Sequence, residues 1–135
     1  MSEPHTWATL PLPPSDNAAH RTGQGRRYSA AAYKAWQDEA GKTLMVARSQ
    51  GLVKPIREGW FHVEIQAPAG MRADTPNINK AVHDLLHRCG VTPDDRWMWS
   101  QLTERCARVS PGTCVVRTWP VFETHAEGVS QDVPA

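Results

Sequence analysis

The sequence predicts a single α+β domain with the element order β-α-β-α-β-β, a mixed sheet and two main helices. Two patterns indicate this class, because apolar residues recur at helical spacing in two stretches and at every second position in shorter stretches between them. The chain has 135 residues, enough to bury one core. Apolar residues make up 40% and charged residues 21%, as is typical of a folded domain.

The first half predicts a strand followed by a helix. The strand, within WATLPLPPSDN, ends at two prolines, and residues 18–28 are expected to form a mobile, basic loop. Ser29 is the expected N-cap of a helix that continues through residue 50, and Gly51 stands just past its end. The apolar stripe of this helix comprises Tyr33, Trp36, Ala40, Leu44 and Ala47.

The second half predicts a strand, a helix and a hairpin. Residues 59–68 alternate between an apolar face and a polar face that carries His62, Glu64 and Gln66. A helix over 77–89 follows, with Gly90 as its C′ residue. Its apolar stripe comprises Ile78, Val82, Leu85, Leu86 and Cys89, and its opposite face carries Asn77, Lys80, Asp84 and His87. Two strands, over 96–109 and 113–122, are joined by the turn sequence SPGT.

Charge is distributed unevenly, although the formal net charge is only +1. Arg21, Arg26 and Arg27 lie together, whereas residues 122–135 are acidic and expected to be disordered. The sequence has neither an apolar run long enough to cross a bilayer nor the order of a signal peptide, so a cytoplasmic protein without a membrane partner is expected. The three cysteines form no CxxC pair and are interpreted as small buried hydrophobes.

The stretch RADTPNINKAVHD supports two interpretations. Thr75 as N-cap, Pro76 at the first helical position and Asp74 near the positive end of the dipole are ordinary choices for a helix start. Aspartates are also ligands for hard cations, so the same stretch could contribute to a metal site.

Ordered motifs along the chain favour the second interpretation. Asp74, Asn77, Lys80 and Asp84 are followed by CGVTPDD, and LPLPPSDN precedes them both. This combination resembles the signature of the RusA-type Holliday junction resolvases over about residues 8–119, and it is far more specific than any one motif.

The resemblance implies a RusA-like nuclease domain over residues 1–121. It implies a Mg²⁺-dependent endodeoxyribonuclease, with Mn²⁺ as a substitute, that acts as a homodimer on four-way junctions or other branched DNA and is encoded by a phage or prophage. By position, the catalytic residues would be Asp74, Lys80 and Asp95, and the metal ligands Asp74, Asp94 and Asp95. Expected DNA contacts are Arg21, Arg26, Arg27, Arg72, Asn77 and Lys80. Pro76 stands where the family has a second aspartate, and Asp94 or Glu64 are the candidates to replace that ligand.

Helix length suggests how the carboxylates could meet. Asp74 precedes the second helix and Asp95 follows it, and thirteen helical residues span roughly 20 Å. The five residues from Val91 to Asp95 reach back about 17 Å at most. The sequence therefore suggests the hypothesis that Asp74 faces Asp95 of a partner chain across a two-fold axis.

Other functions were weighed beside this one. A protein of the same fold could bind junctions without cutting, or a small domain could bind another protein through its acidic tail and tryptophans. Zinc at His83 and His87 is disfavoured, because the sequence offers no obvious third ligand. The six tryptophans are expected mainly in core and dimer contacts, with Trp97 and Trp99 on one face of a strand.

Overall fold

The computed structural model describes residues 3–14, 23–70 and 75–121, and only the backbone of residues 23–30 and 75–77. The predicted order of elements is confirmed. The elements are β1 (Thr6–Pro11), α1 (Gly23–Ser49), β2 (Phe61–Pro68), α2 (Thr75–Arg88), a short 3₁₀ helix η2 (Asp95–Trp97), β3 (Met98–Cys106) and β4 (Thr113–Pro120). The predicted tail, 122–135, and residues 18–22 of the predicted loop lie outside the described residues.

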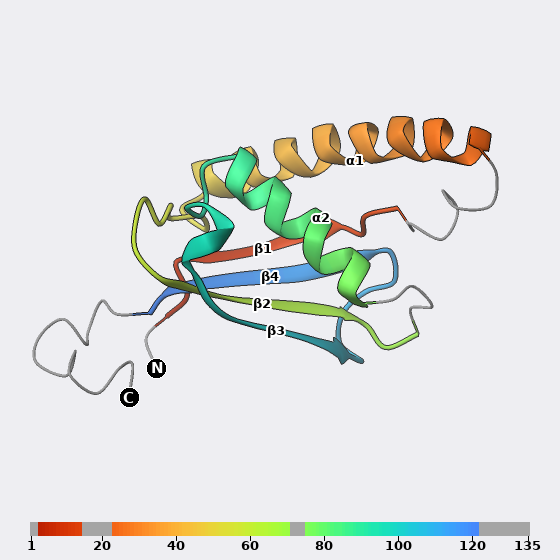
Figure 1. Ribbon diagram of the computed structural model, residues 1–135. Coiled ribbons are helices and arrows are strands. Elements are labelled where there is room, and N and C mark those ends of the chain that lie inside the picture. Colours follow the sequence, from red (N-terminus) through yellow and green to blue (C-terminus); the bar gives the residue numbers. More distant parts are fainter. Residues whose placement is uncertain (1–2, 15–22, 71–74, 122–135) are drawn as a thin grey trace, which may run out of the picture.

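The four strands form one mixed sheet in the order β1-β4-β2-β3. β4 pairs antiparallel with both β1 and β2, whereas β2 and β3 are parallel and connected through α2. Both helices lie on the same face of the sheet (Figure 1). The β2–β3 register shifts by one residue near its start, where Phe61 lies opposite Met98 and His62 opposite Ser100.

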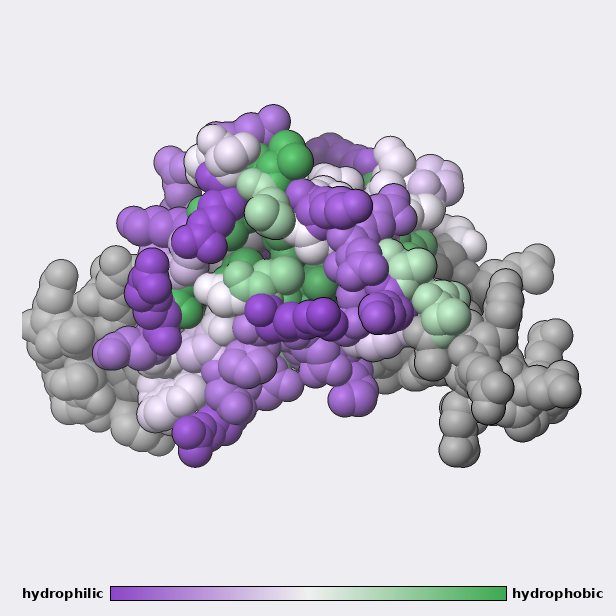
Figure 2. Space-filling model, turned by 90° about the horizontal axis from the view of Figure 1, so that it is seen from above, coloured by the Kyte–Doolittle hydropathy of each residue, from purple (hydrophilic) through white to green (hydrophobic). Residues whose placement is uncertain are grey.

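The core lies between the sheet and the two helices. The inward residues of β2, Phe61, Val63 and Ile65, are almost completely buried against the apolar stripes of both helices. The indole Nε1 of Trp36 donates a hydrogen bond to the carbonyl oxygen of Pro11 at 2.7 Å, which joins α1 to β1. From the helix side, the surface is mostly hydrophilic around a band of apolar residues (Figure 2). The predicted stripes of both helices are confirmed as the faces that meet the sheet.

Two predicted elements, the first helix and the third strand, have the wrong boundaries. α1 begins at Gly23, so Ser29 lies within the helix and residues 23–28, predicted as loop, are helical. Glycine destabilises a helix least in its first turn, because the backbone N–H groups there have no intrahelical partner in any case. The predicted strand over 96–109 is shorter, because Asp95–Trp97 form η2 and β3 ends at Cys106.

Helix ends and cysteines follow the sequence more closely. Gly90 adopts a positive φ of 75°, its N–H donates to the carbonyl of His87 at 3.1 Å, and the N–H of Val91 donates to Leu86 at 2.8 Å. The predicted glycine cap of α2 is therefore confirmed. Cys114 is buried as expected, but Cys89 and Cys106 are only partly buried. No helix among the described residues is long and apolar enough to cross a membrane.

Candidate metal and nucleic-acid site

Lys80 lies on the face of α2 that points away from the core. Its side chain is 82% exposed and approaches Asp84, one turn later, with 3.5 Å between Nζ and Oδ2. Ion pairs this exposed contribute little, since water screens both charges. Lys80 can therefore release Asp84 and neutralise another anion at small cost.

Asp94 and Asp95 lie in the turn that leads from α2 to β3, and both are exposed. Asp94 caps η2, because its Oδ1 accepts a hydrogen bond from the N–H of Arg96 at 3.1 Å. Its other carboxylate oxygen and both oxygens of Asp95 are the hard donors that Mg²⁺ prefers.

His83 lies in the middle of α2 and is buried. Burial lowers the pKa of its imidazole below the usual value, while the carboxylates of Asp95 and Asp84 partly oppose this shift. The return of the chain after Gly90 thus brings Asp95 within electrostatic range of the middle of α2. The predictions that His83 borders the core and that His87 faces solvent are both confirmed.

Within one chain, Asp95 lies far from the start of α2. The N-terminal end of α2 and the η2 turn with Asp95 lie at opposite ends of the helix (Figure 1). Asp74, Arg72 and Arg21 lie outside the described residues, and the side chains of Arg26, Arg27 and Asn77 are not described either. Within the described part of the chain, no three His, Cys, Asp or Glu residues gather as a metal site.

A second polar group, which the sequence did not reveal, lies on the sheet face opposite the helices. His62 contacts Ser100 through Nδ1, at 2.6 Å from Oγ, and Glu64 through Nε2, at 3.1 Å from Oε2. Arg117 donates from Nη2 to the other oxygen of Glu64, Oε1, at 2.7 Å. The alternation of 59–68 predicted the polar positions of His62 and Glu64, but not their partners on β3 and β4.

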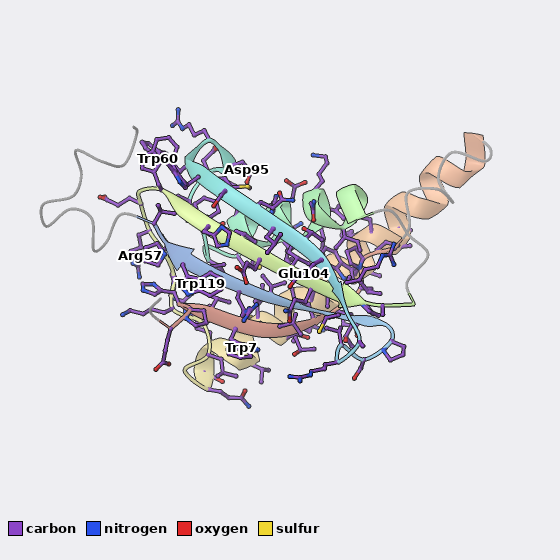
Figure 3. All side chains as sticks on the ribbon, turned by 90° about the horizontal axis from the view of Figure 1, so that it is seen from below. Trp7, Arg57, Trp60, Asp95, Glu104 and Trp119 are labelled. Carbon is purple, nitrogen blue, oxygen red and sulfur yellow. The ribbon has the colours of Figure 1, made fainter. Side chains whose placement is uncertain are left out.

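Aromatic rings surround this network. The guanidinium of Arg117 lies 5.5 Å from the ring centres of both Trp7 and Trp119, close enough for cation–π attraction. Figure 3 shows this face, with Trp7 and Trp119 labelled beside β1 and β4. Glu64 therefore points away from α2 and is held by Arg117 and His62. The expectation that it could replace the missing aspartate ligand is wrong.

Three tryptophans meet where β3 begins. Trp60 packs edge-on against Trp97 and Trp99, with ring centres 5.1 and 5.5 Å apart. The prediction that Trp97 and Trp99 share one strand face is wrong, because Trp97 belongs to η2. The cluster lies beside η2, the short helix that begins at Asp95 and leads into β3.

Comparison with known proteins identifies the family. No family model matches the chain. Over 88 residues, it is 33% identical to the crossover junction endodeoxyribonuclease RusA of Escherichia coli K12 and to that of Shigella sonnei, and 32% identical to that of Enterobacteria phage 82. Each match covers 64% of this chain and 71% of the relative. This chain belongs to the RusA family. The resemblance predicted from the motifs is confirmed, and its RusA-like fold consists of the mixed sheet with α1 and α2 on one face.

Proposed function

We propose that this RusA-family protein is a Mg²⁺-dependent endodeoxyribonuclease that resolves four-way junctions or other branched DNA by paired cuts, as a homodimer. The observation that carries the proposal is the exposure of Lys80, Asp94 and Asp95, in a chain whose relatives are named crossover junction endodeoxyribonucleases. If these side chains were buried, or if their charges neutralised one another, they would contribute only to the stability of the fold. Exposed, they can approach a phosphodiester.

The donor set fits Mg²⁺. Asp94 and Asp95 present carboxylate oxygens to solvent, and Asp74 is the third ligand in this proposal. Mg²⁺ keeps several waters and needs only one or two carboxylates. When bound, it polarises a phosphoryl oxygen and lowers the pKa of the attacking water. Lys80 neutralises charge that develops on the phosphate, and Mn²⁺ can take the place of Mg²⁺.

Binding to DNA is assigned to basic and amide side chains around this site. Arg21, Arg26, Arg27, Arg72 and Asn77 contact phosphates in this proposal, together with Lys80. Each lysine or arginine contact to a phosphate releases counterions, so affinity should fall by roughly 0.9 log units per contact for each tenfold rise in salt.

Pro76 favours a second candidate function. Proline can neither bind a metal nor accept a proton, and it occupies the second position of α2, where relatives would supply an aspartate according to the motif. A protein with this change could recognise four-way junctions without cutting them.

The test is cleavage of a synthetic four-way junction with Mg²⁺ or Mn²⁺. The natural protein is compared with Asp74→Asn, Asp95→Asn and Pro76→Asp variants, and with Asp38→Asn as a control that removes an exposed carboxylate from α1. We expect paired cuts by the natural protein and the control, and loss of cutting in the first two variants.

Two other outcomes would change the conclusion. Salt-sensitive binding to the junction without cutting, followed by cleavage in the Pro76→Asp variant, would establish the second candidate. Equal, weak binding to junction and linear duplex by every variant would contradict both.

A further inference from the structure

Trp60, Trp97 and Trp99 form a tryptophan cluster where β2 and β3 begin. Trp97 and Trp99 are 37% and 44% exposed, although both pack edge-on against Trp60. Two tryptophans elsewhere, Trp36 and Trp119, are only 4% and 7% exposed. Adjacent aromatic rings in contact with water are unfavourable for the free protein, and a contiguous apolar patch of this kind marks a binding site.

A shift in strand register determines where Trp99 lies. Phe61 is opposite Met98 and His62 is opposite Ser100, so Trp99 is the additional residue of β3 at this point. Irregularities of this kind are common next to active sites, where they redirect a side chain. The exposed position of Trp99 therefore follows from the path of the β3 backbone.

The tryptophan cluster lies beside the candidate carboxylates. Asp95 and Trp97 are the first and last residues of η2, and each residue of a 3₁₀ helix rises only about 2 Å. Trp60 and Asp95 lie at the same corner of the sheet (Figure 3). A phosphodiester that reaches Asp95 therefore brings its neighbouring nucleotide to the cluster.

The charges around the cluster fit a nucleotide better than an apolar protein surface. Arg57 and Arg96 are exposed, and arginines bind phosphates. Asp94 and Asp95 are exposed as well, and aspartates are depleted from the cores of protein interfaces. A nucleotide carries an aromatic ring that tryptophan can stack on and a phosphate that Mg²⁺ can link to carboxylates.

We propose that the tryptophan cluster is a base-stacking site, which holds one unpaired nucleobase of branched DNA next to the phosphodiester that is cut. The inference rests on the proposed function, since that function brings DNA to Asp95. Bases inside a duplex are stacked on their neighbours, so only an unpaired or opened base can present its face to tryptophan. The cluster thus favours branched DNA over intact duplex through ring contacts that any base can make.

The first test uses 2-aminopurine, a fluorescent adenine analogue that is quenched by stacking, as one unpaired base at the branch point of a synthetic junction. Every protein carries Asp95→Asn, which prevents cutting under the proposed function. Trp97→Leu and Trp99→Leu remove a ring but keep apolar bulk. The matched control is Trp7→Leu, because Trp7 is 52% exposed on β1. We expect both cluster variants to lose the quenching and roughly 5- to 140-fold in affinity, and the control to lose neither.

The second test separates stacking from packing. Trp99→Phe retains a ring and should restore most of the quenching, and with Trp97→Leu it keeps the test decisive if Trp99→Leu fails to fold. The natural cluster should also bind the junction with an unpaired base more tightly than the same junction fully paired. This preference should fall toward one in Trp97→Leu and Trp99→Leu, an effect that loss of stability alone would not produce.

Three outcomes would overturn the inference. Unchanged quenching in both leucine variants, beside a natural protein that cuts junctions, would remove the stacking site and leave the proposed function standing. Unchanged quenching together with an altered sedimentation coefficient of Trp99→Leu would assign the cluster to contact with another protein chain. Equal binding of the natural protein to junction and linear duplex would contradict both the stacking site and the proposed function.

Discussion

The two faces of the sheet use the same strands in different ways. On the covered face, Phe61 and its neighbours in β2 meet two helices and form the core. On the opposite face, His62 and Glu64 lie between Ser100 and Arg117, and every contact joins groups of the same face. Burial of apolar side chains thus stabilises the face that the helices cover. Pairing between polar side chains stabilises the opposite face. Removing a protein face from water costs less free energy when the charges on that face are already paired.

The largest effect should follow from removing bulk on the covered face. Phe61 is 1% exposed, so Phe61→Ala leaves a cavity that neighbouring side chains cannot fill. We expect the free energy of unfolding to fall by about 3–5 kcal/mol. Urea denaturation followed by tryptophan fluorescence measures this loss. Val46→Ala is the control, because Val46 is exposed on α1, and it should change stability by less than about 0.5 kcal/mol.

A smaller effect should follow from breaking the polar network. Glu64→Gln removes the charge that pairs with Arg117 and His62, and the side chains of Glu64 and Arg117 are only 18% and 23% exposed. Because the Arg117 guanidinium would then be partly buried without its carboxylate, we expect the free energy of unfolding to fall by about 1–3 kcal/mol. The same denaturation experiment applies, with Glu104→Gln as an exposed control. Equal effects of the two substitutions would show that the network does not stabilise this face.

Sequence patterns predicted the covered face better than the opposite one. The stripes from Trp36 to Ala47 and from Ile78 to Leu86 are confirmed, because helical period and burial follow from local spacing. The Glu64–Arg117 pair was not predicted, since it joins residues 53 positions apart whose encounter depends on strand order. The start of α1 was missed for a different reason. Ser29 has the residue type of a cap, yet the helix continues through it.

The sequence predicted which residues belong to the candidate site, but not how they are arranged in space. Lys80 and Asp95 were identified from ordered motifs, and both are exposed as their proposed roles require. Spacing also suggested that one chain separates Asp95 from the start of α2. It could not show that β3 offers an open edge, because edges follow from the order of strands in the sheet.

Acid should weaken the covered face through His83. The pKa of this buried imidazole lies below its usual value in the folded protein, so the unfolded chain binds the proton more readily. Stability is therefore full above the unfolded pKa, near 6.5, and falls as the pH drops from there toward the lower folded pKa. Denaturation without divalent cations between pH 7.5 and 5 measures the slope. His83→Leu should flatten it and His87→Gln should not, and equal slopes in all three proteins would contradict this assignment.

The weakest perturbation is chemical labelling, which tests whether the covered face opens at all. Burial raises the pKa of the Cys114 thiol to about 12, and this side chain is completely buried where β4 meets β1. At pH 8 only about one molecule in ten thousand carries the reactive thiolate. Iodoacetamide should therefore label the partly buried Cys106 in the native protein, while Cys114 reacts only in denaturant, as peptide mass spectrometry can show. Labelling of native Cys114 at a rate equal to that of global unfolding would still fit the comparison. Labelling faster than global unfolding would mean that β1 separates from β4 on its own. The backbone hydrogen bonds that Trp7 and His5 make with Leu52 and Lys54 would then stabilise β1 less than their number implies.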